Sequence, residues 1–220
     1  MAECVIIDKC MGERFLAAGK SEGEYIINGI PGNALGAYLD GASIEVHGNV
    51  QDAVGDTMND GRIVVHGSAG DALGYAMRGG EIYVEEDTGY RTGIHMKQYG
   101  DKKPVIIVGN RAGSFLGEYL AGGIIVILGL KSNANDLLGN FTGTGMHGGK
   151  IFVRTNEFHY ILPSQVSVHE ATEDEMLEIH EYILNFSDMF GVNQEDIKKE
   201  TFFVLTPNTQ NPYKRMYVAN

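Results

Sequence analysis

Two histidines and a glutamate occupy matching positions in successive stretches of this 220-residue chain. His47, His66 and Glu85 follow one another at intervals of 19 residues. If those stretches stack as neighbouring strands, two imidazoles and a carboxylate stand in line at steps of roughly 5 Å. Imidazole nitrogen and carboxylate oxygen are ligands of zinc and similar ions, so the row is a candidate metal site. The simpler interpretation, which we favour, is a row of exposed polar side chains at the edge of a coil, and on it we expect no metal.

Two further patterns resemble ligand sites, and each has a simpler structural explanation. Asp52, Asp71 and Asp136 stand at the same place in their repeats, which would suit calcium, but aspartate is also a common residue for capping turns. The glycines of residues 143–148 have the spacing of a dinucleotide-binding loop. That loop must be followed by a helix, whereas a strand-like sequence begins at Lys150. We therefore expect turn-capping aspartates and no nucleotide site.

The chain contains two cysteines, Cys4 and Cys10, six positions apart. Their spacing matches no metal motif, so we interpret them as reduced structural thiols. An iron–sulfur cluster normally needs about four protein ligands, and two cysteines cannot supply them. The remaining histidines show no spacing that joins them to a nucleophile, and no Gly-x-Ser-x-Gly motif occurs. We expect neither catalytic residues nor a bound cofactor in this chain.

Charge and hydropathy exclude several classes of protein. There are 29 acidic and 17 basic residues, and the net charge of -12 repels phosphate backbones and anionic lipids. No apolar run approaches the roughly 18 residues that span a bilayer. Asp8 and Lys9 interrupt the first apolar stretch too early for a secretion signal. We predict a cytoplasmic protein with neither nucleic-acid nor membrane partners.

The elements that would position these side chains come from an internal repeat. Glycine is unusually frequent, with 30 residues, and it follows short pairs of apolar, mostly β-branched residues spaced two apart. The pairs recur after 19, 19, 19, 23, 20 and 26 residues: Tyr25 and Ile27, Ile44 and Val46, Ile63 and Val65, Ile82 and Val84, Val105 and Ile107, Ile125 and Ile127, Ile151 and Val153. Between the pairs lies a frame of the form Gly-xx-Gly-xxx-Gly, which is incomplete or stretched in some units. The repeat glycines are Gly29, Gly32, Gly36, Gly48, Gly55, Gly67, Gly70, Gly74, Gly89, Gly93, Gly109, Gly113, Gly117 and Gly139.

A unit of about 19 residues with a single strand favours a parallel β-helix. Period-two alternation argues against helical repeats, which also need roughly 33 or more residues per unit. One strand per unit with glycine at the corners suits a coil that rises by one strand spacing per turn. We predict a mainly β protein, a single-stranded right-handed parallel β-helix of about seven coils, with a C-terminal α-helical segment.

The two sides of each strand are expected to differ in role. Both members of each pair point inward and form the core, and the residue between them points outward. The outward residues form a nearly continuous apolar row where a solvated face would be polar: Ile26, Glu45, Val64, Tyr83, Ile106, Val126 and Phe152. Either the C-terminal part of the chain or another protein must cover this face. The candidates for docking a partner are Val64, Tyr83, Ile106, Val126 and Phe152.

The chain divides into residues 1–164, the β-helix with an N-terminal lead-in, and residues 165–220, a tail of different character. Thr172 and Glu175 form a capping box, apolar residues follow at helical spacing, and Gly191 can end the helix, so we predict a helix over 173–190. A second cap at Asn193 predicts a short helix over 194–199, and residues 201–205 resemble a strand. The tail is either a lid on the column or an arm that docks onto a partner subunit.

The glycine frame repeated between the apolar pairs resembles the C-terminal GXGXG domain of the glutamate synthase large (alpha) subunit. The resemblance covers about residues 25–155, and residues 71–84 and 117–129 carry it most clearly. The separate short chain, together with residues 88–97, resembles the stand-alone form of that domain. One of the component chains of formylmethanofuran dehydrogenase is similar to the same repeat.

The resemblance implies a scaffold within a larger enzyme. Glutamate synthase hydrolyses glutamine, passes the ammonia through a tunnel and adds it to 2-oxoglutarate beside FMN and an iron–sulfur cluster. By resemblance, FMN and the cluster belong to partner chains, and this chain holds the amidotransferase and synthase chains at a fixed separation. The alternatives are a glycine-repeat component of formylmethanofuran dehydrogenase, or a metal-binding protein that uses His47, His66 and Glu85. Self-association of the column into a homo-oligomer is also open.

Overall fold

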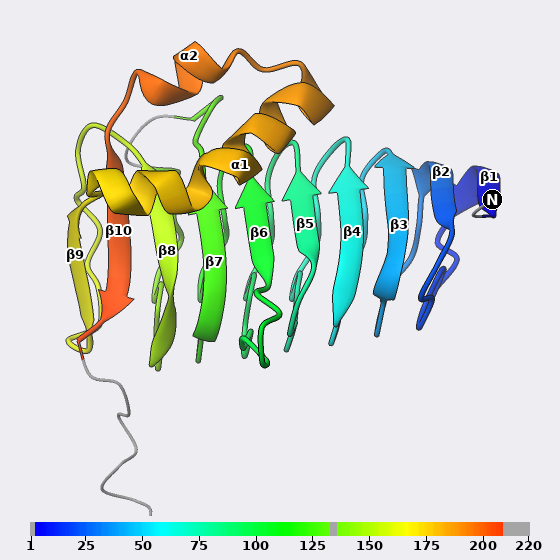
Figure 1. Ribbon diagram of the computed structural model, residues 1–220, viewed down its shortest axis with the longest axis horizontal. Coiled ribbons are helices and arrows are strands. Elements are labelled where there is room, and N and C mark those ends of the chain that lie inside the picture. Colours follow the sequence, from blue (N-terminus) through cyan, green and yellow to red (C-terminus); the bar gives the residue numbers. More distant parts are fainter. Residues whose placement is uncertain (1–2, 133–135, 209–220) are drawn as a thin grey trace, which may run out of the picture.

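The computed structural model describes residues 3–132 and 136–208. Within them the chain winds as a right-handed parallel β-helix of about seven turns, and each turn adds one strand to a single sheet (Figure 1). The parallel strands are β1 (Cys4–Met11), β2 (Glu24–Ile30), β3 (Asp40–His47), β4 (Asp60–Val65), β5 (Glu81–Val84), β6 (Val105–Val108), β7 (Ala121–Ile127) and β8 (Gly148–Arg154). The predicted fold class is confirmed.

The strand β1 extends the column beyond the first predicted repeat. Its Val5 and Ile7 pair in parallel with Tyr25 and Ile27 of β2. The pairing shifts register between Asp8 and Cys10, so the residue spacing after the apolar pair differs from that of the later units. Because of this irregularity, the first strand does not show the spacing of the later repeats. The segment predicted as a lead-in is itself a strand of the column.

The wall opposite the sheet consists of turns that hydrogen-bond from coil to coil. Isolated parallel bridges join Val50, Ala69, Thr88, Ala112 and Leu138 in succession. The turns donate to both neighbouring coils: the Ala53 N–H donates to the carbonyl of Asp71 at 2.8 Å, and the Gly55 N–H donates to the carbonyl of Leu35 at 2.9 Å. This ladder pairs backbone groups that an irregular buried segment would leave unsatisfied.

Glycine is required where the turns approach the rest of the coil. Gly55 has a φ of +67°, and a Cβ on it would lie 2.5 Å from Cδ1 of Ile82, which fills that space from the opposite wall. A Cβ on Gly48 would overlap the carbonyl oxygen of Gly29 in the preceding coil. The repeated glycines therefore have two structural roles. Some leave room for a core side chain, and others let the backbones of two coils approach closely.

The interior of the column is a continuous aliphatic core. Inward side chains of the strands, such as Ile44 and Ile63, meet leucines and methionines from the turn wall, such as Leu73 and Met77, and all of these are buried. Removing apolar surface from water stabilises a fold by about 25 cal/mol per Å². The core is thus the main source of stability along the whole column.

The predicted alternation is wrong at β6. Val105 and Ile107 are predicted to point inward and Ile106 outward, but Ile106 pairs with the inward Ile82 and faces the core. Val105 and Ile107 belong to the outer cluster instead. All four residues of β6 are buried, so the sequence is apolar on both sides and its period cannot distinguish them. The longer connection before β6 includes an antiparallel bridge within residues 99–102.

The C-terminal part completes the sheet and covers it. The strand β10 (Phe202–Pro207) lies antiparallel between β8 and β9 (Val166–Glu170), and the helices α1 (Glu173–Phe190) and α2 (Gln194–Lys198) connect β9 to β10. The predicted capping box of α1 is present, since the Glu175 N–H donates to the Thr172 hydroxyl and the Thr172 N–H donates to the Glu175 carboxylate. Gly191 ends α1 in the left-handed conformation and Asn193 caps α2, both as predicted. Neither helix of the described residues is long and apolar enough to cross a bilayer.

Candidate functional site

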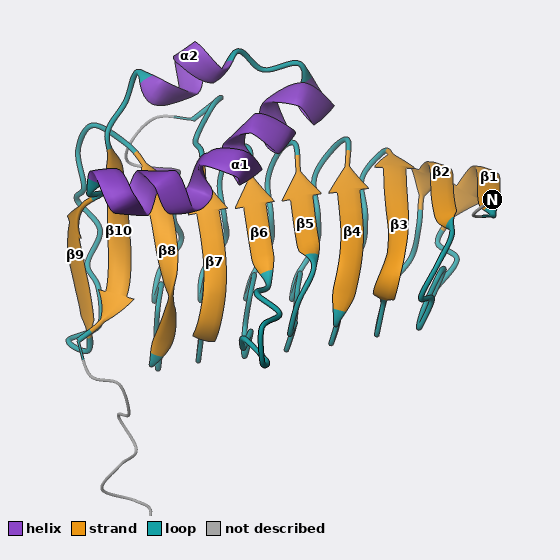
Figure 2. Cartoon of the chain, in the orientation of Figure 1, coloured by secondary structure: helices purple, strands orange, loops and turns teal. Residues whose placement is uncertain are grey.

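The outward face of the sheet has a covered part and an open part. The helix α1 lies across the strands from β5 to β8 and across β10 (Figure 2). Its Ile179, Ile183 and Phe186 are buried in one cluster with outward residues of those strands, such as Tyr83 and Phe152. The strands β1, β2 and β3 lie beyond the end of α1 (Figure 2). We call residues 173–198, which contain α1 and α2, the lid. The lid and the column share one apolar interface, and the open part of the face starts where α1 ends.

The chain itself occupies the residues predicted to dock a partner. Val64, Tyr83, Val126 and Phe152 belong to the buried outer cluster, and Ile106 belongs to the inner core. Of the two interpretations for the cover of this face, the structure has the chain's own tail. An apolar row on a strand shows only that something buries it, and the sequence pattern alone does not distinguish a lid from a partner.

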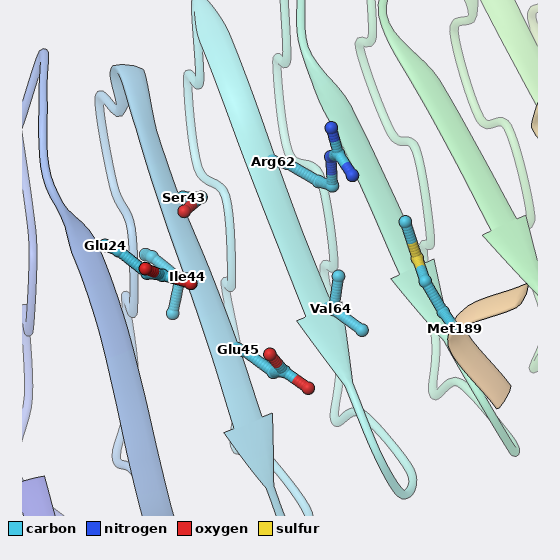
Figure 3. A pocket seen from close by; sticks show the side chains of 7 residues that line it. All are labelled: Glu24, Ser43, Ile44, Glu45, Arg62, Val64 and Met189. Atoms are coloured by element: carbon cyan, nitrogen blue, oxygen red, sulfur yellow. The ribbon is translucent and has the colours of Figure 1, made fainter. Parts of the chain in front are cut away.

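A cavity of about 270 Å³ opens on the uncovered part of the face, beside the last turn of α1. It is lined by Glu24, Ser43, Ile44, Glu45, Arg62, Val64 and Met189 (Figure 3). The polar groups come from β2, β3 and β4, and Met189 comes from α1. Arg62 forms no salt bridge with any described residue, so its guanidinium is available to bind an anionic group.

The two predicted histidines meet next to this cavity, together with a carboxylate. The rings of His47 and His66 stack with centroids 4.8 Å apart and planes 21° apart. Oε1 of Glu45 lies 2.8 Å from Nε2 of His66 and 3.8 Å from Nε2 of His47. Glu85, the predicted third member of the row, lies on the other side of His66, with its Oε2 4.0 Å from Nδ1. Glu45 thus lies close to both histidines, whereas Glu85 lies near His66 on the side away from Glu45.

Sequence reasoning overlooked Glu45 because it was assigned only to the outward apolar row. Glu45 and His47 are two positions apart on β3, so their side chains share a face. His66 follows on the neighbouring strand, in register with His47. The alternation that identified the core therefore also contained the signal for this contact.

Other predicted sites have structural roles. The Asp52 carboxylate accepts from the Asp71 N–H at 2.9 Å, and the Asp71 carboxylate accepts from the Tyr90 N–H at 2.8 Å, so both cap turns of the next coil. Asp136 does not share their position, because it precedes the bridge residue Leu138, whereas Asp52 and Asp71 follow theirs. The three aspartates therefore form no single row.

The two cysteines and the glycine motif lie in different structural contexts. Both cysteines are free, Cys4 exposed and Cys10 buried. Burial and a hydrogen bond to Glu13 raise the pKa of Cys10 to about 11, so its sulfur is a thiol at neutral pH. The glycine run at 143–148 leads into β8 and not into a helix, which removes the structural context of a dinucleotide loop.

Exposed aromatic side chains lie on the wall of turns, which we call the turn face. The Arg91 guanidinium lies 5.0 Å from the centre of the Phe115 ring, and Phe115 stacks on Phe141 at 5.0 Å. His95 stacks on Tyr119 at the same distance. The exposed aromatic residues of the turn face are Phe15, Tyr38, Tyr75, Tyr90 and Phe141. Aromatic residues and arginine are enriched in protein interfaces, so the turn face is a candidate contact surface.

Two comparisons with known proteins agree with the repeat. A family model described as the GXGXG motif matches residues 3–204. The chain is also 44% identical over 225 residues to the uncharacterized protein MJ1350 of Methanocaldococcus jannaschii, an alignment that covers 98% of this chain and 86% of that protein. The match spans both the column and the lid.

Proposed function

This chain belongs to the GXGXG-motif family, that of the glutamate synthase alpha C-terminal domain, and on this basis we propose that it is a non-catalytic scaffold subunit of a glutamate synthase. In this proposal it binds an amidotransferase chain and a synthase chain that carries FMN and an iron–sulfur cluster. The observation that carries the proposal is the extent of the family match, which runs from residue 3 to residue 204 and so includes the column and its lid.

The construction of the column supports a positioning role. Its inner core runs from Cys10 in the first rung to Val153 in β8 without interruption, and turns and strands are hydrogen-bonded at each step. Close-packed interiors resist deformation, so surfaces at different heights of the column keep a fixed separation. Two active sites that exchange a reactive intermediate such as ammonia need this constraint.

The turn face supports the proposed docking of partner chains. The outward face of the sheet is already covered by α1 over most of its length, whereas Phe141 and Tyr90 of the turn face are 59% and 51% exposed. Buried aromatic residues commonly dominate the binding energy of protein interfaces. In the proposal, these rings become buried against a partner.

The test is reconstitution with the amidotransferase and synthase chains of a glutamate synthase from the same organism. We expect the three chains to co-elute in size-exclusion chromatography, and we expect glutamate formation from glutamine and 2-oxoglutarate to depend on this chain. Phe141→Asp and Tyr90→Asp should each weaken assembly, by about tenfold or more if the ring is a binding hot spot. Glutamate formation with free ammonia should be affected less than formation with glutamine.

The matched control is Leu177→Asp, which removes an apolar side chain that is 70% exposed on α1 and lies outside the turn face. It should leave assembly unchanged. Elution of the chain alone, with glutamate formation equal in its presence and absence, would contradict the proposal. Co-purification with chains of formylmethanofuran dehydrogenase would replace it by the alternative assembly.

A further inference from the structure

Three side chains on the open part of the sheet face point at one another, and we propose that Glu45, His47 and His66 bind a divalent transition-metal ion of the zinc type. One ligand atom from each lies within 4.8 Å of the others. Both histidines present Nε2 to the same carboxylate oxygen, at 2.8 and 3.8 Å. Two imidazoles and one carboxylate form a common ligand set for zinc. The site is separate from the proposed scaffold role and does not depend on it.

The distances from Glu45 to the two histidines bracket the value that a metal ion requires, and the stacked rings must rotate to direct both nitrogens at one ion. Zinc bonds of about 2.0–2.2 Å in tetrahedral geometry put two ligand atoms roughly 3.4 Å apart. The separations between Glu45 and the two histidines, 2.8 and 3.8 Å, lie on either side of that value. All three side chains are partly exposed, with 41% for Glu45, 46% for His47 and 25% for His66, so they can turn without displacing the core.

The sheet brings the three ligand residues together before any ion binds, and only their side chains have to rotate. Glu45 and His47 share one face of β3, and His66 continues the neighbouring strand β4. The separation of the two stacked rings, 4.8 Å, equals the spacing of strands in a sheet, so the backbone sets the distance between the imidazoles. Because the backbone already fixes the ligand residues next to one another, ion binding has to order only the side chains.

The surroundings of His66 favour a cation. Oε2 of Glu85 lies 4.0 Å from Nδ1, the nitrogen that does not point at Glu45, and adds a second negative charge beside the imidazole. The Phe190 ring packs edge-on against His66, with centroids 5.1 Å apart. Phe190 lies in the last turn of α1, which contains no basic residue, and the C-terminal end of a helix attracts positive charge.

Three protein ligands leave at least one coordination position open. Glu45 also lines the cavity beside the last turn of α1, where the Arg62 guanidinium forms no salt bridge with a described residue. Zinc sites with three protein ligands hold water or an exogenous ligand in the remaining position. The proposed ion would therefore be reachable by a small anion that enters this cavity.

The experiment uses the full chain without an affinity tag, stripped of metal with a chelator that is then removed. Equilibrium dialysis against Zn²⁺ with elemental analysis should give about one ion per chain, and Co²⁺ should give the visible absorption of a site with nitrogen and oxygen ligands. Glu45→Gln, His47→Ala and His66→Ala should each weaken Zn²⁺ binding by about tenfold or more, since loss of even a supporting residue costs 10–100-fold. Zn²⁺ should also raise the melting temperature of the wild-type chain and not that of Glu45→Gln.

His159→Ala is the matched control, because His159 pairs with Glu157 at 2.8 Å but belongs to no group of three metal-ligand side chains among the described residues. It should bind Zn²⁺ as the wild type does. Far-UV circular dichroism verifies folding, and if His66→Ala does not fold, the more exposed Glu45→Gln and His47→Ala decide the question. The proposal is overturned if the wild type binds no Zn²⁺, or if the variants at Glu45 and His47 bind as tightly as the wild type. In the second case the contact is only a hydrogen-bonded row on the surface.

Discussion

At the scale of single residues, the column depends on contacts between glycine in one wall and isoleucine in the other. Cδ1 of Ile82 packs into the space that a Cβ on Gly55 would occupy, and Cδ1 of Ile106 does the same at Gly74. The contact with Gly74 also explains why Ile106 of β6 points into the core and not outward, because its side chain fills the space beside that glycine.

Gly55→Ala should destabilise the protein mainly through its contact with Ile82. The new Cβ would lie 2.5 Å from Cδ1, whereas the positive φ alone costs roughly 1–2 kcal/mol for a residue with a Cβ. Ile82→Val removes Cδ1 and by itself costs about 0.5–1.5 kcal/mol. We expect the double variant to be more stable than the sum of the single effects predicts, as measured by urea unfolding.

Gly19→Ala is the control, because Gly19 has a similar φ of +66° and nothing lies within 4 Å of its Cβ position. It should show the backbone cost alone. Equal losses for Gly19→Ala and Gly55→Ala, or strictly additive effects in the double variant, would mean that the contact with Ile82 is unimportant.

At the scale of elements, α1 is fixed at its start by a charged cap. The Glu175 carboxylate accepts from the Thr172 N–H at 3.1 Å, and it lies 3.1 Å from Nε2 of His169 and 3.4 Å from Nζ of Lys150. Burial by itself raises the pKa of Glu175, but the hydrogen bonds from Thr172 and His169 outweigh it and lower the pKa from 4.5 to about 2. The helix start is thus tied to β9 and to β8.

Glu175→Gln should remove a stabilisation that depends on pH. Because the folded pKa is lower than the unfolded one, the carboxylate stabilises the protein above pH 4.5, and this contribution is lost as the pH falls from 4.5 to about 2. At neutral pH we expect a loss of about 1–2 kcal/mol in the free energy of unfolding, as for other helix caps. Urea unfolding of both proteins across this pH range should show the difference shrinking toward the acid end.

Glu173→Gln tests whether the effect belongs to the cap or to any negative charge in the first turn of α1. Glu173 is exposed and lies in the same turn. It should have a much smaller effect. A constant difference between wild type and Glu175→Gln at every pH would contradict the assigned role of the carboxylate.

At the scale of the whole molecule, one buried arginine joins the lid to the column. The guanidinium of Arg154, at the end of β8, donates to the carbonyls of Leu128, Asp196 and Ile197 at 3.0, 2.9 and 2.7 Å. It also forms a salt bridge of 3.2 Å with Glu200. Burial lowers the pKa of Arg154, and the acidic neighbours oppose that shift. One planar group thus satisfies carbonyls from the column and from α2 together.

Arg154→Met should weaken the attachment of the lid. The substitution fills a similar space but leaves buried carbonyls without a donor, at about 1–3 kcal/mol for each unsatisfied group. We expect a loss of about 3 kcal/mol or more in the free energy of unfolding, and faster proteolysis within α2 than within the column. Arg62→Met, on the exposed part of the sheet face, should change stability by less than about 0.5 kcal/mol. Equal unfolding midpoints for the two variants would refute the proposed attachment.

Local patterns in the sequence determined much of this structure. The spacing of Ile63 and Val65 and of their counterparts predicted the parallel strands, because successive side chains of a strand alternate between its two faces. Thr172, Glu175 and Gly191 predicted both ends of α1, because capping involves residues within one turn of each other. The side assigned to β6 failed, since a strand buried on both faces shows no alternation.

Only the tertiary structure decided what covers the sheet and which side chains meet on its open part. The apolar row through Tyr83 and Phe152 requires a cover, but a helix of the same chain and a partner protein bury apolar surface equally well. The contact of Glu45 with His66 joins neighbouring strands along a diagonal, and it depends on side-chain rotation and on the end of α1 beside it. Such contacts form between residues distant in sequence, and no local sequence pattern predicts which of them will form.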